Sequence, residues 1–110
     1  MNSELLEARN KLKSKLLNNA YTVIDYCKQE ILDIVEIGIF GSLARDDFKC
    51  NSDADIYVIT KETCPRTIRG DIRCFAEEHH CDVVFFEEAY FNNTDIPLIH
   101  YIKRDRRILE

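Results

Sequence analysis

The sequence has little glycine and proline, no tryptophan and no long apolar run. With only three glycines and two prolines, its 110 residues exclude a fibrous or low-complexity chain, and 45% hydrophobic residues beside 32% charged ones are typical of a folded globule. No apolar stretch approaches the ~20 residues that cross a bilayer, so we expect no membrane segment. We expect residues 1–110 to form one domain, too short to include a separate substrate domain.

The chain also lacks an excess of positive charge, because its 20 acidic residues outnumber its 15 lysines and arginines and give a formal net charge of −5. A chain without a broad positive field is not expected to have nucleic acid as its primary partner. The cysteines are odd in number, form no CxxC pair and follow no charged-then-apolar signal segment, which predicts reduced thiols in a cytoplasmic protein. They are Cys27, Cys50, Cys64, Cys74 and Cys81.

The first half of the chain alternates between helical and extended patterns. Apolar residues recur every three or four positions from Ser3 to about Leu32, which predicts a long amphipathic helix, with allowance for a bend near Asn18 and Asn19. The β-branched and aromatic run 34–40 predicts a strand buried on both faces. "SLARDDF" is compatible with a short helix, and a polar turn then leads into a second strand, "DADIYVIT", over residues 53–60.

The second half repeats this alternation. Pro65 suits a first helical position, and we expect one face of the following helix to carry Ile68, Ile72, Phe75, Ala76 and His79. "CDVVFF" predicts a third strand over residues 81–86. A last helix is expected from about Pro97, with Leu98, Ile99 and Ile102 facing inward, before a basic run and a short "RILE" tail. Helices that separate strands predict an α/β (α+β) fold with helices packed on a small mixed sheet.

Two acidic residues stand one residue apart where the second strand begins. In a strand, Asp53 and Asp55 point to the same face, and two like charges so close require a cation between them. Carboxylate oxygens without nearby histidine or cysteine ligands favour Mg²⁺ over zinc. Asp82, at the start of the third predicted strand, would complete a cluster for two metal ions if the two strands are neighbours.

A Gly-Ser pair ends the first predicted strand. Gly41 allows the backbone to approach a ligand closely, and the N–H groups and hydroxyl at Ser42 are donors suited to phosphate oxygens. A phosphate site and an acidic metal site a short distance apart are typical of phosphoryl or nucleotidyl transfer.

Together these residues resemble the signature of the DNA polymerase β-type nucleotidyltransferase superfamily, and within it the minimal nucleotidyltransferases. Asp82 falls where that family has its third acid, and "IPLIHYIKRDRRIL" resembles its final helix and strand. By motif the resemblance covers Ile34 to Phe86. The matching positions are Gly41, Ser42, Ala44, Arg45, Ser52, Asp53 and Asp55.

The resemblance implies a nucleotidyltransferase fold and a mechanism. Asp53 and Asp55 would hold two Mg²⁺ ions, and Asp82 would bind the ion that activates the acceptor hydroxyl. Gly41 and Ser42 would hold the β- and γ-phosphates of ATP, and AMP would be left on the acceptor. Family members of this size are often antitoxins that adenylylate a tyrosine of a HEPN-domain ribonuclease toxin, so the resemblance implies a HEPN-type partner.

One departure from the family pattern leaves alternatives open. Asp46 and Asp47 stand where the family usually has glycine and its neighbour, and they either turn outward or weaken triphosphate binding. A second hypothesis is therefore a nucleotidyltransferase-fold module that regulates its partner by contact, with weak turnover or none. A third is an enzyme that modifies a small hydroxylated molecule such as an aminoglycoside, which would need a second domain or a dimer.

Other charged and metal-binding residue types have two interpretations each. Arg45 either reaches phosphate or pairs with Asp46 or Asp47. The basic run binds phosphate or an acidic partner, or else complements the dipole of the last helix. The nearby cysteines and histidines either form a zinc site or are buried thiols and a histidine pair at the end of a helix. The first helix, with lysines on its polar side, either only packs across the sheet or also binds a partner. These groups are Lys103, Arg104, Arg106 and Arg107; Cys74, His79, His80 and Cys81; and Lys11, Lys13 and Lys15.

Overall fold

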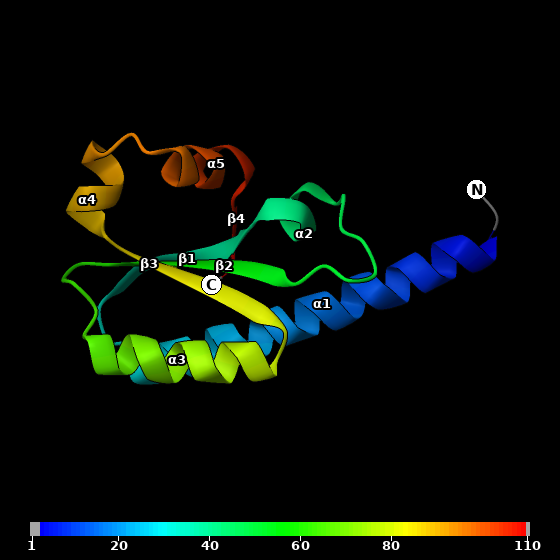
Figure 1. Ribbon diagram of the computed structural model, residues 1–110, viewed down its shortest axis with the longest axis horizontal. Helices are drawn as coiled ribbons and strands as arrows, with labels where there is room; N and C mark the ends of the chain where they lie inside the picture. The colour runs from blue at the N-terminus through cyan, green and yellow to red at the C-terminus, as the bar shows by residue number, and fades with distance from the viewer. Residues whose placement is uncertain (1–2, 110) are drawn as a thin grey trace.

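The computed structural model describes residues 3–109. Helices and strands alternate through most of this range, as the sequence patterns predict (Figure 1). The elements are α1 (Ser3–Glu30), β1 (Ile34–Phe40), α2 (Gly41–Arg45), β2 (Ala54–Thr60), α3 (Arg66–Glu78), β3 (Cys81–Glu87), α4 (Glu88–Asn93), α5 (Pro97–Asp105) and β4 (Arg107–Ile108).

The strands form one mixed sheet in the order β3-β2-β1-β4. β1 pairs antiparallel with both β2 and β4, whereas β2 and β3 are parallel. A parallel pair needs a crossover connection, and α3 supplies it. The register places Asp55 opposite Phe40 of β1 on one side and opposite Asp82 of β3 on the other. Asp55 therefore lies on an inner strand of the sheet, between these two residues.

The two faces of the sheet are covered by different helices. α1 and α3 lie on one face, and α4 and α5 lie on the other (Figure 1). Side chains alternate along β2: Ile56 and Val58 belong to the core beneath α1 and α3, and Tyr57 and Ile59 belong to the core beneath α4 and α5. β2 is therefore buried on both faces. β1 was expected to be so along its whole length, but Val35 is 40% exposed.

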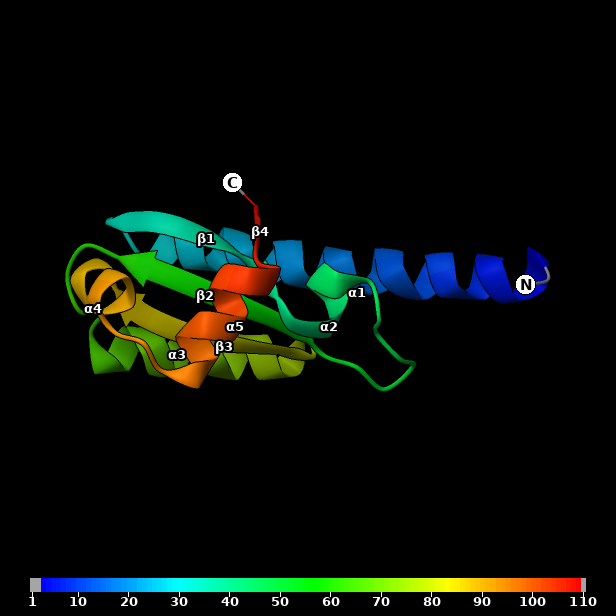
Figure 2. The same cartoon turned by 90° about the horizontal axis from the view of Figure 1, so that it is seen from above.

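α1 is one continuous helix that passes through Asn18 and Asn19 without interruption and ends at Glu30, two residues earlier than expected. Its second half packs on the sheet through buried residues from Leu16 to Cys27. Its first half extends beyond the sheet (Figures 1 and 2), which gives the molecule extents of 48 × 27 × 21 Å. Leu5 and Leu6 are 62% and 49% exposed there, so this half of α1 lies outside the core.

Several expected boundaries and orientations were wrong. β2 begins at Ala54 and not at Asp53, and Pro65 is the cap that precedes α3 and not its first residue. Leu98 was expected to face inward, but it is 37% exposed, whereas Ile99 and Ile102 are buried. Leu98 turns outward because two buried residues three positions apart already define the inner face of this short helix.

One short element was not expected, and another was expected only from the family resemblance. α4 has six residues with a single buried one, Phe91, which is too short to show helical periodicity. The end of the chain, which the residue pattern left as a tail, includes β4 as the resemblance implied, and this strand pairs with Gly38 and Ile39 of β1. Gly38 lacks the Cβ that would collide with the carbonyl oxygen of Arg107, so β4 can lie against it.

All five cysteines are free thiols, as expected from their number and spacing. Within residues 3–109, no helix has both the length and the apolar character needed to cross a membrane.

Candidate functional site

Asp55 is the centre of the candidate site. It lies one residue into β2 on the face that also carries Tyr57, which is the face covered by α5. Its partner across the parallel pair is Asp82, and cross-strand partners place their side chains on the same face of a sheet. The structure thus brings Asp55 and Asp82 together, with Asp53 just before β2.

Gly41 forms the wall against which Asp55 lies. Its φ is +73°, in the left-handed region that side chains rarely adopt. A Cβ built at this position would also collide with Oδ2 of Asp55. The positive φ therefore requires glycine here, and a Cβ would in addition displace the Asp55 carboxylate, which lies directly against the backbone that begins α2.

The acidic residues interact electrostatically. Burial, together with the charges of Asp82 and Asp53, raises the pKa of Asp55 to about 6, whereas Arg45 opposes the shift. A cation at this position would relieve the repulsion between the carboxylates. Oxygen donors of this kind suit Mg²⁺.

The acidic residues do not form a ready metal cage. Within the described range, no three histidine, cysteine, aspartate or glutamate side chains are grouped so that they could hold a metal ion. Asp53 and Asp82 are exposed and Asp55 is partly buried. The residues fit a hard cation by their chemistry, but their carboxylates would have to converge in order to hold it.

Two hollows border these carboxylates. One, of about 400 Å³, includes Gly41, Ser42 and Asp55. The other, of about 590 Å³, includes Asp53 and Asp82. The structure therefore places Asp55 with the Gly-Ser pair, and Asp53 with Asp82, in two neighbouring spaces rather than in one.

The first hollow also contains α5 residues that the sequence analysis did not select as site residues. Leu98 and Tyr101 are 37% and 49% exposed and stand one helical turn apart. The available sequence signal was an apolar pair on the outer side of a helix, but only the packing of α5 over the sheet directs it toward Gly41. The remaining lining residues are Phe40, Arg45, Arg104 and Asp105.

Arg45 connects α2 with α5. It donates to Asp47 at 3.1 Å and to Asp105 at 2.8 Å, so of the two neighbouring aspartates it pairs with Asp47 and not with Asp46. Hydrogen bonds from Arg104 and Arg45 lower the pKa of Asp105 to about 2, and its side chain is only 6% exposed. Asp105 therefore remains ionised and holds both arginines beside the hollow.

The rest of the basic run has structural contacts of its own. Arg106 forms an ion pair with Glu36 at 2.9 Å, and Glu36 also accepts a hydrogen bond from the Tyr57 hydroxyl. The Lys103 ammonium lies 5.2 Å from the centre of the Phe91 ring. These contacts attach the end of α5 to the sheet and to α4.

Asp46 and Asp47 turn outward. Asp46 has a φ of +64° and ends α2 in the left-handed conformation, which explains why glycine is usual at this position. Its carboxylate pairs with Lys13 of α1 at 3.2 Å, and Asp47 pairs with Arg45. Their side chains are 59% and 60% exposed, so each extra charge faces solvent and has a cation beside it.

The proposed zinc ligands do not converge. Cys74 is exposed on α3, whereas Cys81 is buried at the start of β3. Burial raises the pKa of Cys81 to about 12, with further contributions from Asp53, Asp82 and Asp55, so the thiol stays protonated. His79 caps α3, and His80 turns the chain with a φ of +57°. The alternative of buried thiol and helix-end histidines describes these residues.

A family model described as a nucleotidyltransferase domain matches residues 21–109. Among solved structures, a protein described as a nucleotidyltransferase from Sulfolobus solfataricus has 18% identity and a TM-score of 0.63, with 91% of this chain and 84% of that chain covered. One described as a minimal nucleotidyltransferase has 21% identity and a TM-score of 0.59, with 99% and 97% covered.

Complexes of toxin and antitoxin share the fold as well. A tri-AMPylated HEPN toxin of Shewanella oneidensis in complex with an MNT antitoxin matches with 19% identity and a TM-score of 0.60, and the match covers 86% of this chain and 71% of that chain. A search of curated proteins found no match. The small mixed sheet with helices packed on it, expected from the sequence, is thus the nucleotidyltransferase fold.

Substitution of Gly41 by alanine should destabilise the protein. The left-handed φ and the collision with Asp55 together predict a decrease of about 2 kcal/mol in the free energy of unfolding. Urea denaturation measures it. Gly70→Ala is the matched control: it lies in open space within α3, and the same change should raise stability by up to about 1 kcal/mol. Equal effects of the two substitutions would contradict the assigned role of Gly41.

Asp55→Asn should change how stability depends on pH in metal-free buffer with EDTA. The folded-state pKa of Asp55 is raised to about 6, so the folded wild type holds a proton that the unfolded chain releases near pH 4. Because of this group, the free energy of unfolding of the wild type decreases as the pH rises from about 4 to about 6. The asparagine variant should gain stability relative to wild type across this window in urea titrations, and a constant difference would contradict the raised pKa.

Proposed function

Because the chain belongs to the nucleotidyltransferase-domain family, we propose that it transfers AMP from ATP to a tyrosine hydroxyl of a HEPN-type partner and acts as its antitoxin. The observation that carries the proposal is the Asp55 carboxylate, which lies against the left-handed Gly41 and in register with Asp82. Two solved complexes with the same fold support it, one a toxin-antitoxin with AMP-PNP and one with an AMPylated HEPN toxin.

The hollow of about 400 Å³ is the proposed nucleotide site. The backbone N–H groups and the hydroxyl of Gly41 and Ser42 would hold the β- and γ-phosphates. Across the hollow, the exposed faces of Leu98 and Tyr101 offer an apolar and an aromatic surface for the base. Arg45 and Arg104 add positive charge beside the phosphates, while Asp105 fixes their positions.

Asp53, Asp55 and Asp82 are the proposed ligands of two Mg²⁺ ions. When bound, Mg²⁺ would neutralise phosphate charge and make the acceptor hydroxyl more acidic. The chain itself must supply ionised carboxylates for this purpose. Since the pKa of Asp55 is about 6 without metal, Asp55 is ionised at neutral pH, at the cost of repulsion from its two neighbours.

The acceptor would approach from the hollow that contains Asp53 and Asp82, on the other side of Asp55 from the nucleotide. The hydroxyl oxygen would form a bond to the α-phosphorus of ATP, the bond from that phosphorus to the bridging oxygen would break, and pyrophosphate would leave. The hydroxyl proton would pass to solvent. Asp82 would orient the hydroxyl, because its carboxylate is exposed to this space.

A binding module without turnover is the second candidate. It is favoured by the absence, within residues 3–109, of three side chains already grouped as metal ligands. The first half of α1, which projects from the sheet, offers a surface for contact (Figures 1 and 2). Against it, the two aspartates that argued for weak turnover face outward and are paired with cations.

The transfer reaction is tested with Mg²⁺, ATP and the product of the neighbouring gene, by intact mass measurement of that product. We expect an increment equal to AMP. Asp53→Ala should reduce the rate to below about 1% of wild type, because a metal ligand is lost. Asp71→Ala, which removes an exposed carboxylate of α3 that lines neither hollow, should retain the wild-type rate. A tight complex with no added mass under any nucleotide would reject the transferase and leave the binding module.

Asp46→Gly tests whether the extra acidic residues limit turnover. Glycine fits the left-handed conformation at this position, and the carboxylate it removes points to solvent. The transfer rate and the apparent KM for ATP should therefore stay within about twofold of wild type, since an exposed ion pair is worth little. A KM reduced tenfold or more would mean that the charge of Asp46 does reach the triphosphate.

A further inference from the structure

The first half of α1 is basic in an otherwise acidic chain. Between Ala8 and Ile24 the sequence contains no acidic residue, whereas the chain as a whole has a net charge of −5. The cations of this segment are Arg9, Lys11, Lys13 and Lys15. They precede the first buried residue of α1, Leu16, at the end of the helix that projects beyond the sheet (Figure 2).

Two of these cations hold the loop between α2 and β2. Arg9 donates to the backbone carbonyl groups of Phe48 and Asp46, and its guanidinium lies 4.1 Å from the centre of the Phe48 ring. Lys13 forms the ion pair with Asp46. Their charges are therefore compensated within the fold, and the loop that leads to Asp53 is fastened to α1.

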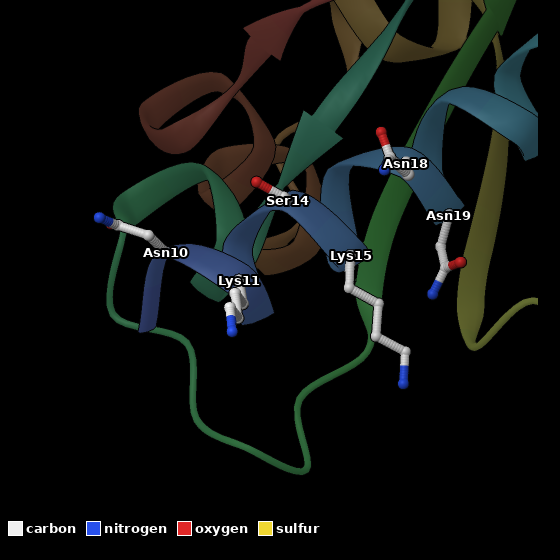
Figure 3. A pocket seen from close by; sticks show the side chains of 6 residues that line it. All are labelled: Asn10, Lys11, Ser14, Lys15, Asn18 and Asn19. Carbon is white, nitrogen blue, oxygen red and sulfur yellow. The ribbon is translucent and has the colours of Figure 1, made fainter. Parts of the chain in front are cut away.

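The other two cations have no such role. Lys11 and Lys15 are exposed, and neither forms an ion pair within residues 3–109. Glu7 stands one turn before Lys11 without pairing with it, and no acidic residue stands one turn from Lys15 on either side. Figure 3 shows both lysine side chains and that of Asn19 projecting from the same side of α1. Two like charges one turn apart destabilise an isolated helix slightly, so their position is favourable only opposite negative charge.

These lysines lead to the candidate active site. A surface hollow of about 590 Å³ along α1 contains Lys11 and Lys15 together with amide side chains. Lys15 and Asn19 also line a groove of about 220 Å³ between α1, the loop 50–53 and His80. Asp53, one of the proposed metal ligands, lines the same groove. Because the hollow and the groove share Lys15 and Asn19, we treat them together as one depression from Lys11 to Asp53.

We propose that this depression, from Lys11 to Asp53, docks an acidic segment of the partner protein that carries the acceptor hydroxyl. The proposal rests on the proposed function, because the groove includes Asp53, one of the proposed metal ligands. Lys11 and Lys15 would pair with carboxylates of that segment, and Asn19, which projects from the same side of α1, would bind its backbone. The docked segment would then lead its hydroxyl past Asp53 toward Asp82.

The charge distribution favours a protein segment over RNA. Affinity for a nucleic acid comes from neutralising many phosphates, and only two uncompensated lysines are available here. A longer polyanion would also continue onto Asp53 and Asp82, where like charges repel it. An acidic protein segment could be recognised by two ion pairs with these lysines, because other surfaces of the partner protein would supply the remaining contacts of the interface.

Docking is measured by fluorescence anisotropy without nucleotide or Mg²⁺. The probe is a fluorescein-labelled peptide with three glutamates on one side of a tyrosine and uncharged residues on the other. We expect salt-dependent binding, about tenfold weaker for the double variant Lys11→Glu and Lys15→Glu. The matched control, Lys28→Glu with Lys61→Glu, makes the same change in net charge at exposed positions outside the depression and should bind as wild type. Thermal unfolding verifies that both variants fold.

Three results would overturn the inference. Equal loss in both double variants would mean that only net charge matters. Equally tight binding of a peptide with glutamines in place of glutamates would exclude charge recognition. A decauridylate probe that binds more tightly than the acidic peptide and depends on the same lysines would assign the surface to RNA. AMP transfer is measured separately: lysine-dependent docking with no transfer from ATP to any acceptor would reject the proposed reaction and leave the docking surface.

Discussion

The contact between the Asp55 carboxylate and the Gly41 backbone is the constraint on which the site depends. It exists because β1 and β2 pair antiparallel with Phe40 opposite Asp55, so the end of one strand meets the beginning of the other. The left-handed φ of Gly41 turns the chain into α2 at that point. The carboxylate occupies the volume that any larger residue would require. The proposed phosphate donors and the proposed metal ligand Asp55 are adjacent for this geometric reason.

The same contact has an electrostatic cost that the scaffold must offset. The pKa of Asp55 shows that its ionised form is disfavoured in the folded protein, because it is partly buried and has two acidic neighbours. Stability comes instead from the two apolar cores that enclose β2, one under α1 and α3 and one under α4 and α5. A strand buried on both faces can carry a repulsive acidic residue at its exposed end, as functional sites often require.

Ion pairs fasten the segments around this centre. Arg45 and Asp105 hold α2 to α5, and Lys13 and Asp46 hold the loop after α2 to α1. The acidic residues that depart from the family pattern are therefore structural: Asp46 takes the left-handed turn, and Asp47 shares Arg45 with α5. With Lys13 occupied in this way, only Lys11 and Lys15 remain available on the basic part of α1.

The sequence by itself determined the strands and the long helix, because these follow from local periodicity, and it showed the Gly-Ser pair, Asp53 and Asp55 as one motif within a short segment. The tertiary structure alone decided that Asp82 stands beside Asp55 while Asp53 precedes the strand, that Leu98 and Tyr101 face the Gly-Ser pair, and that Arg45 pairs with Asp105. It also decided that α4 forms. These outcomes depend on strand register and helix packing between distant segments, whose contacts are stabilised jointly by the whole fold and leave no periodic signal in any one of them.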